Sequence, residues 1–109
     1  MTDKRIVLTT TGSRDDAQQI ASALVERQLA ACVNIVEKIE SVYRWEGRVA
    51  HAAEWLLLIK TTETAFEKVR QAIKELHPYE VPEILSIAVQ DGSAEYLNWI
   101  EENSKAPAS

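Results

Sequence analysis

Strand-type and helix-type spacings of hydrophobic residues alternate along the chain. Residues 4–11 are apolar and β-branched at their centre, which predicts a strand. Gly12 ends this strand, and Ser13, three residues before Asp16, predicts the start of a helix in the manner of a capping box. Apolar residues then recur at helical spacing, at Ala17, Ile20, Ala21, Leu24 and Val25. We therefore expect a strand followed by an amphipathic helix of about four turns.

The middle of the chain predicts a long β-hairpin. Residues 30–45 contain no Gly or Pro and are rich in β-branched and aromatic residues, and residues 49–61 form the returning strand. Residues 45–48, Trp-Glu-Gly-Arg, form the turn, with Gly47 able to take a positive φ. One face of the first arm carries Ile39, Ser41, Tyr43 and Trp45. Both faces of the returning arm are largely apolar, so we expect both to be covered.

The last third of the chain predicts two helices with a strand between them. Thr61 or Thr62 can cap the first helix, whose apolar residues recur at helical spacing: Phe66, Val69, Ile73 and Leu76. Pro78 ends that helix, and Pro82 prevents it from restarting. Residues 83–89 are an apolar run of strand length, and Ser93 is a suitable N-cap for a last helix over residues 94–102.

The predicted order is β-α-β-β-α-β with one further helix. Two split β-α-β units joined by a hairpin are typical of the ferredoxin-like α+β sandwich, in which one antiparallel sheet carries two helices on one face. We expect a single domain over residues 1–102. Residues 103–109 are small and polar, and we expect them to form a disordered tail.

The hairpin is too long for one compact domain of this size. An arm of a dozen residues, at about 3.3 Å per residue, spans about 40 Å, whereas a domain of this length has a radius of gyration of about 13 Å. A projecting ribbon would expose Tyr43, Trp45 and Trp55 and would leave open strand edges. A symmetric homo-oligomer would bury these groups. The alternative is a bulge near residues 37–38 that folds the strand back on itself.

Composition narrows the classes of function. The chain has 17 acidic and 12 basic residues and a net charge of −5, without clusters of Lys or Arg, which argues against nucleic-acid binding and against an anionic membrane surface. The apolar run over residues 55–59 is too short to cross a bilayer, and the N-terminus lacks the apolar segment of a secretory signal. We therefore expect a cytoplasmic protein. The single cysteine, Cys32, excludes an internal disulfide and a zinc site built on several thiolates.

Residues 77–83, His-Pro-Tyr-Glu-Val-Pro-Glu, are the most chemically dense segment. An imidazole, a phenol and two carboxylates lie in a loop that two prolines stiffen, and such groups can ligate a divalent cation, with imidazole suiting copper, nickel or zinc. The same residues can also simply shape a turn. His51, near the hairpin tip, is expected to be exposed. Lys60 either extends past apolar neighbours to water or supplies a fixed positive charge to a cleft, which Asn34 could also line.

Cys32 has two interpretations as well. A free cysteine at the start of a strand is usually a small packed residue, and it would need a base and an oxyanion hole nearby to act as a catalytic thiol. The chain has no Gly-rich phosphate loop, no nucleophile elbow and no His-Glu-x-x-His motif. We therefore expect a binding protein, not an enzyme.

Five segments together resemble the CutA family of divalent-cation tolerance proteins. They cover essentially the whole chain in order: Ala30–Ile35, Ser41–Gly47, Leu58–Thr61, His77–Ile84 and Tyr96–Ile100. The resemblance implies a ferredoxin-like subunit in a homotrimer, an architecture related to the PII signalling proteins. It also implies a link to tolerance of copper and other divalent ions and a cytoplasmic location in bacteria.

The resemblance also implies site residues. In some members the proposed copper ligands are a Cys near the end of the first strand and two successive His, whereas the matching positions here are Thr9, Leu76 and His77, so that one of the three is retained. The family's cleft between subunits maps onto Cys32, Trp45, Lys60, His77, Tyr79 and Glu83.

Three functional hypotheses follow. The first is a homotrimer that binds a divalent cation such as Cu²⁺ through His77, Glu83 or Glu80, and Cys32 of a neighbouring subunit. The second is a PII-like sensor or signalling trimer that holds a small anionic molecule in the cleft near Lys60 and Trp45. The third, a hydrolase or transferase that uses Cys32 or His77, lacks a pair of base and nucleophile.

Overall fold

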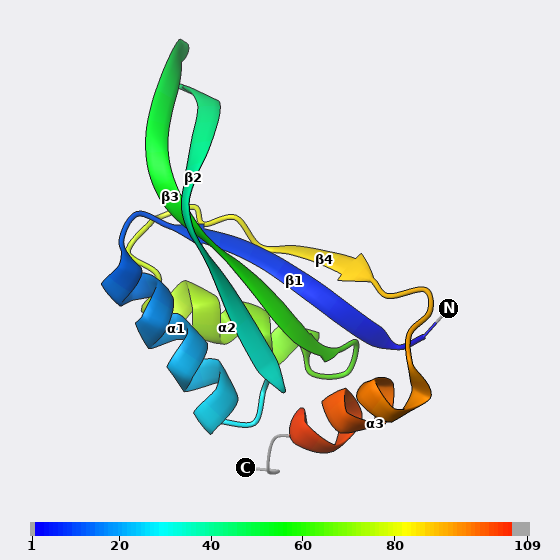
Figure 1. Cartoon of the computed structure of the whole chain (residues 1–109). Coiled ribbons are helices and arrows are strands. Elements are labelled where there is room, and N and C mark those ends of the chain that lie inside the picture. Colours follow the sequence, from blue (N-terminus) through cyan, green and yellow to red (C-terminus); the bar gives the residue numbers. More distant parts are fainter. Residues whose placement is uncertain (1, 106–109) are drawn as a thin grey trace.

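The computed structural model describes residues 2–105, which form four strands and three helices. Their order is β1 (Lys4–Thr11), α1 (Arg14–Glu26), β2 (Cys32–Trp45), β3 (Arg48–Thr62), α2 (Phe66–Leu76), β4 (Leu85–Ala88) and α3 (Ala94–Asn103). The strands form one antiparallel sheet in the order β2-β3-β1-β4 (Figure 1). The predicted α+β order of elements is confirmed, and the sheet order is that of a ferredoxin-like sandwich.

The hydrophobic core lies between one face of the sheet and the helices α1 and α2. The sheet and the helices both contribute fully buried side chains to it: Val7, Leu57 and Ile59 from the strands, and Ile20, Leu24, Val69 and Ile73 from the helices. Leu57 and Ile59 alternate along β3, and the helical residues recur at a spacing of four. The predicted amphipathic faces are therefore the ones that pack together.

The helix N-termini follow the predicted capping chemistry in two cases out of three. The hydroxyls of Ser13 and Ser93 each accept a hydrogen bond from the backbone N–H three residues later, which caps α1 and α3. Thr62 accepts a similar bond within the turn before α2, but that helix begins only at Phe66 and its N-cap has no side-chain hydrogen bond. Thr61 instead donates to the carbonyl of Leu29.

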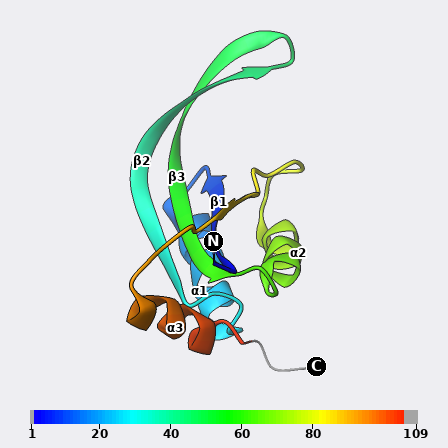
Figure 2. The same cartoon turned by 90° about the vertical axis from the view of Figure 1, so that its right-hand side faces the viewer.

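The hairpin turn is a two-residue loop. Trp45 pairs with Arg48, and the two residues between them, Glu46 and Gly47, have φ values of 50° and 79°. Positive φ at both positions is the signature of a type I′ turn, whose twist matches the flanking strands. Beyond the helices the arms continue as a two-stranded ribbon, residues 39–54, which projects from the body of the subunit (Figures 1 and 2).

A β-bulge marks the point where the ribbon begins. Val36 pairs with Leu56 and Ile39 pairs with Glu54, so β2 advances three residues while β3 advances two. Lys38, within the bulge, has a φ of 53°. Pairing resumes beyond it and continues to the turn, so the alternative in which a bulge folds the strand back is wrong, although the bulge lies where it was expected.

The opposite face of the sheet, which we call the open face, is only partly covered. It is predominantly apolar, with Ile6, Leu8, Leu56, Leu58, Leu85 and Ile87 sharing it by their cross-strand pairing. The helix α3 packs at one end of it, where Lys4 Nζ lies 3.0 Å from Glu101 Oε1. We expected both faces of β3 to be covered. The helices α1 and α2 cover one face, whereas α3 covers only one end of the open face.

The fourth strand is shorter than predicted. Only residues 85–88 pair with β1, although the N–H of Val89 also donates to the carbonyl of Lys4. At the C-terminus, Asn103 is the last residue of α3 and Ser104 is buried, while residues 106–109 of the expected tail lie outside the described residues. No helix within residues 2–105 is both long enough and apolar enough to cross a membrane.

Candidate functional site

A cavity of about 870 Å³ lies between the ribbon and the segment that joins α2 to β4. Trp45, Tyr79 and Glu83, three of the predicted cleft residues, line it together with Tyr43 and Glu54. Figure 2 shows the ribbon curving toward the side on which the α2–β4 segment lies. The curvature and the loop therefore bring together residues that are more than thirty positions apart in the sequence.

Tyr79 and Glu54 contribute two hydrogen-bonded polar side chains to the lining of this cavity. The Tyr79 hydroxyl donates a hydrogen bond of 2.9 Å to Glu54 Oε2, and Glu54 is only 8% exposed. Burial of the phenol raises the pKa of Tyr79 to about 12, and the hydrogen bond that the phenol donates to the Glu54 carboxylate contributes to this shift. A Cβ on Gly12 would lie 3.0 Å from the Tyr79 hydroxyl oxygen, so glycine at this position leaves room for the phenol.

His77 lies directly beside Tyr79 and is 7% exposed. Its Nε2 donates to the carbonyl of Thr10 over 2.6 Å, and its Nδ1 accepts from the N–H of Tyr79 over 3.1 Å. A carbonyl can only accept and an amide N–H can only donate, so these partners define the neutral tautomer with hydrogen on Nε2. Because β4 pairs with β1 only as far as Leu8, the Thr10 carbonyl lies beyond that pairing and is available to the imidazole.

Cys32 and Lys60 lie at the other end of the β2–β3 ladder. They are directly paired across the two strands, and both are partly buried. The Lys60 ammonium donates a hydrogen bond to the side-chain carbonyl of Asn34, as expected for a residue that shares this strand region. Within a single subunit Lys60 lies six positions along β3 from Glu54, the residue of that strand that lines the cavity.

The six predicted cleft residues thus fall into two groups. Trp45, Tyr79 and Glu83 line the cavity, with His77 next to them, while Cys32 and Lys60 form a separate pair. Among residues 2–105 no three His, Cys, Asp or Glu side chains are close enough together to hold a metal ion. His51 is exposed near the hairpin tip, as predicted.

Glu54 is a site residue that the sequence analysis missed. It shares a strand face with Leu56 and Leu58 and pairs with Ile39, so it is a carboxylate at the end of an apolar stretch, one residue beyond the last pair of β3 with β1. Charged side chains are almost never fully buried unless they have a partner. That placement is the signal that could have identified it.

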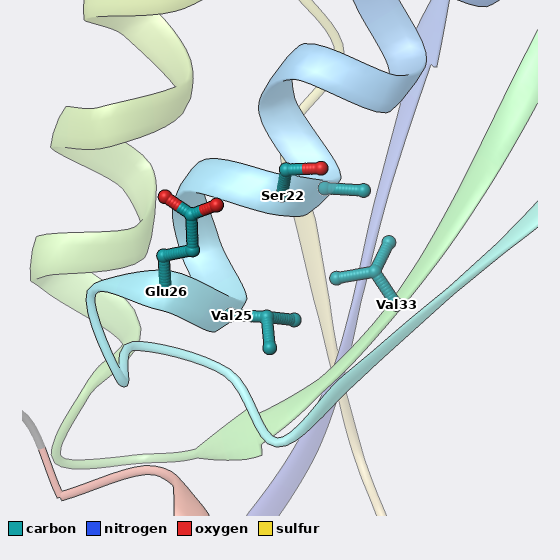
Figure 3. A pocket seen from close by; sticks show the side chains of 5 residues that line it. Ser22, Val25, Glu26 and Val33 are labelled. Carbon is teal, nitrogen blue, oxygen red and sulfur yellow. The ribbon is translucent and has the colours of Figure 1, made fainter.

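A second hollow, of about 330 Å³, lies between α1 and the start of β2. Figure 3 shows Val25 of the helix pointing toward Val33 of the strand, while the Glu26 carboxylate points away from it. Glu26 is the only ionisable group among its lining residues. This hollow offers no combination of groups that could bind a metal or perform catalysis.

An α+β subunit with a four-stranded antiparallel sheet and three helices is shared with solved divalent-cation tolerance proteins. The structure of the protein from Thermus thermophilus superposes with a TM-score of 0.92 at 50% sequence identity, covering 94% of this chain and 99% of that one. The structure described as the periplasmic divalent cation tolerance protein CutA from Archaeoglobus fulgidus gives a TM-score of 0.91 at 37% identity, covering 94% and 99%.

The sequence comparisons agree with the structural ones. Residues 5–103 match the family model described as CutA1 divalent ion tolerance protein, so the chain belongs to this family. The curated divalent-cation tolerance protein CutA of Thermus thermophilus is 50% identical over 101 residues, which are 93% of this chain and 98% of the relative. The chloroplastic CutA protein of Arabidopsis thaliana is 39% identical over 92% of this chain, which spans 55% of that longer relative.

Proposed function

We propose that the protein is a homotrimeric divalent-cation tolerance protein that binds metal ions, copper first among them, weakly or in a cleft between subunits. The observation that carries the proposal is membership of the family over residues 5–103. Binding, not catalysis, is its role in the response to metal ions. We also propose that it works in the cytoplasm, although relatives described as chloroplastic and periplasmic occur in the family.

The surface that one subunit leaves uncovered supports the trimer. On the open face Leu85 and Ile87 are 56% and 50% exposed, and the ribbon adds the exposed side chains of Tyr43 and Trp45. Large contiguous apolar patches are rare on monomers and usually mark an interface. Packing of identical copies around a closed symmetry axis would cover both regions at once.

The separation of the predicted ligands supports a site between subunits. Cys32 lies at one end of the β2–β3 ladder, whereas His77 contacts Thr10, opposite Leu56, and Glu83 lines the cavity beside the ribbon. The predicted ligands do not converge within the described part of one subunit, so a complete set would need two copies. Thiolate and imidazole are good ligands for copper. Because both ring nitrogens of His77 already have hydrogen-bond partners, binding through this residue costs one of those bonds, which favours weak affinity.

The test combines the oligomeric state with metal titration. Sedimentation at micromolar concentration is expected to give a trimer, and Cu²⁺ titration is expected to give about ten times weaker binding for His77→Ala than for the wild type. His51→Ala, at an exposed histidine on the same chain, is the matched control and should bind as the wild type does. A stable monomer would refute the trimer. Equal Cu²⁺ binding by wild type and His77→Ala would refute a metal site at His77.

Mixed trimers separate a site between subunits from a site within one. Cys32→Ser and Glu83→Gln chains each lack one predicted ligand, but a trimer containing both has interfaces where an intact Cys32 faces an intact Glu83. Refolding the two variants together should recover part of the Cu²⁺ binding that each has lost. No recovery would mean that the ligands do not come from different subunits.

A PII-like trimer that binds a small anion is the alternative. Its support is Lys60, a partly buried ammonium that hydrogen-bonds to the neutral Asn34 side chain and has no carboxylate within ion-pair distance in residues 2–105. Such a charge can hold a carboxylate or phosphate group. An anionic metabolite that raises the melting temperature of wild type but not of Lys60→Ala would favour this function over metal binding.

A further inference from the structure

The loop between β4 and α3 contains the only Asp-Gly pair of the sequence, Asp91-Gly92. Both residues are exposed and lie outside the helices and strands. Figure 1 shows this loop at the edge of the subunit, where the chain turns from β4 into α3. The loop belongs neither to the open face nor to the ribbon, so the trimer proposed above does not require it to be covered.

An Asp-Gly pair can rearrange without an enzyme. The backbone nitrogen of the glycine attacks Cγ of the aspartyl side chain, the nitrogen gives up its proton and the carboxyl group gives up a hydroxyl, so that water leaves and a succinimide ring forms. A second water molecule then opens the ring. Attack at Cγ restores aspartate, whereas attack at the backbone carbonyl carbon gives isoaspartate, in which the main chain runs through Cβ and Cγ.

The local structure leaves the two reacting groups free to meet. None of the hydrogen bonds and ion pairs within residues 2–105 involves the Gly92 N–H or the Asp91 carboxylate. Glycine also has no Cβ to hinder the approach of its nitrogen to Cγ. The other aspartates differ, because Asp15 and Asp16 lie in the first turn of α1 and Asp3 forms an ion pair.

The linker from β4 to α3 has little room for a longer backbone. At one end the Val89 N–H donates to the carbonyl of Lys4 over 3.0 Å, and at the other Ile100, which is 3% exposed, anchors α3. Between these points a Cβ on Gly92 would lie only 3.1 Å from Leu97 Cδ2, so the chain runs close against the helix. Isoaspartate adds one backbone atom between these two fixed points.

The N-cap of α3 is the contact that this extra atom disturbs most easily. Ser93 lies two residues after Asp91, and its hydroxyl accepts a hydrogen bond of 3.4 Å from the N–H of Tyr96. The corresponding bond at Ser13, which caps α1, is shorter at 3.1 Å. Loss of the N-cap leaves backbone N–H groups of the first helical turn without a partner and destabilises that turn.

We propose that Asp91 isomerises spontaneously to isoaspartate and that this modification loosens the start of α3. The reaction consumes and returns one water molecule and needs no other reactant. No residue of the proposed copper site takes part in it. The modification is therefore independent of metal binding, and either proposal can be wrong without the other.

Ageing of the full chain in buffer at physiological temperature tests the chemistry. Trypsin releases the peptide of residues 75–105, in which Asp91 is the only aspartate. An isoaspartyl methyltransferase with labelled S-adenosylmethionine measures isoaspartate in this peptide, and fragmentation mass spectrometry locates it. Asp91→Glu keeps the carboxylate but would have to close a larger ring, so it should lower the isoaspartate content by at least about tenfold.

The matched control for this change is Asp15→Glu, at an exposed aspartate within α1, which should leave the isoaspartate content of the peptide unchanged. No isoaspartate in aged wild type, or an equal amount in aged Asp91→Glu, would overturn the proposed modification.

Hydrogen exchange tests the effect on α3. Exchange of the first-turn amides of α3 should rise with isoaspartate content in wild type and should stay constant on ageing of Asp91→Glu. Ser93→Ala removes the cap without the modification and should give a similar rise in fresh protein. Ser13→Ala, at the cap of α1, is the matched control and should leave α3 unchanged. Equal exchange of α3 in fresh and aged wild type, despite accumulated isoaspartate, would overturn the proposed loosening.

Discussion

The two halves of the β2–β3 hairpin have similar alternating apolar side chains but differ in what covers them. Next to the helices, Leu57 and Ile59 are fully buried. Beyond the bulge, Trp45 and Val49 are among the most exposed large hydrophobic residues of the described chain. Alternation determines which face a side chain takes, whereas burial depends on a second layer, and only the first half has one within the subunit. The ribbon therefore carries an apolar surface that no second layer within residues 2–105 covers.

The largest expected effect lies in the covered half. Ile59→Ala removes a fully buried side chain between the sheet and the helices, and it should lower the free energy of unfolding by about 2–5 kcal/mol. Urea denaturation measures this loss, which should be the same at every protein concentration because the cavity forms within one subunit. Val49→Ala in the ribbon is the matched control.

Val49→Ala should lower the free energy of unfolding by less than Ile59→Ala does, and its effect should depend on protein concentration. Val49→Ala is expected to cost about 1 kcal/mol or less. In the proposed trimer neighbouring subunits cover the ribbon, so that cost should shrink on dilution. A large, concentration-independent loss for Val49→Ala would contradict the difference between the two halves.

The next effect lies at the tip of the ribbon. Gly47 has a φ of 79°, and a Cβ there would meet no atom within 4 Å, so Gly47→Ala should cost about 1 kcal/mol through backbone strain alone. Glu46→Gly is the matched control, because it relieves a φ of 50° and should stabilise the turn. Hydrogen exchange of the ribbon amides should rise in the first variant and fall in the second. A change of the same sign in both would contradict the type I′ assignment.

The smallest effect concerns the junction between ribbon and body. Because the pKa of Tyr79 in the folded protein is about 12, above the usual 10.0, the neutral phenol stabilises the fold below pH 10, and that contribution is lost as pH rises toward 12. Ultraviolet titration should show one tyrosine ionising near pH 12, and Glu54→Gln should lower its pKa. Tyr79→Phe should remove this high-pH step and Tyr96→Phe should retain it. A step that Tyr96→Phe removes would contradict the assignment.

Features that depend on adjacent residues were predictable from the sequence. The turn at residues 45–48 follows from Gly47 between two β-rich segments, and the caps at Ser13 and Ser93 follow from hydroxyl chemistry at the start of an apolar periodic segment. Each of these signals lies within about four residues of the structure it specifies, so no tertiary contact can easily override it.

Features that depend on distant partners were not predictable in the same way. Residues 83–89 have the composition of a longer strand, yet only residues 85–88 pair with β1, because the loop before them approaches the edge through His77 instead. The imidazole therefore has a structural partner in Thr10, sixty-seven positions away, that no local pattern reveals. The burial of Glu54 and the separation of Cys32 from Glu83 likewise depend on the folded arrangement.

The extra residue at the bulge also constrains how the length of this protein can vary. It shifts the alternation of β2 by one, so that Ile39 and the odd-numbered residues after it share the face of Val36 and Glu54. Deleting Lys38 alone would remove the bulge, and Ile39 would still pair with Glu54, so Tyr43 and Trp45 would keep the face that they now occupy. Shortening both arms by two residues each would keep every face in place. Outside the bulge, natural or engineered variation in the length of the ribbon should therefore occur in paired, even steps.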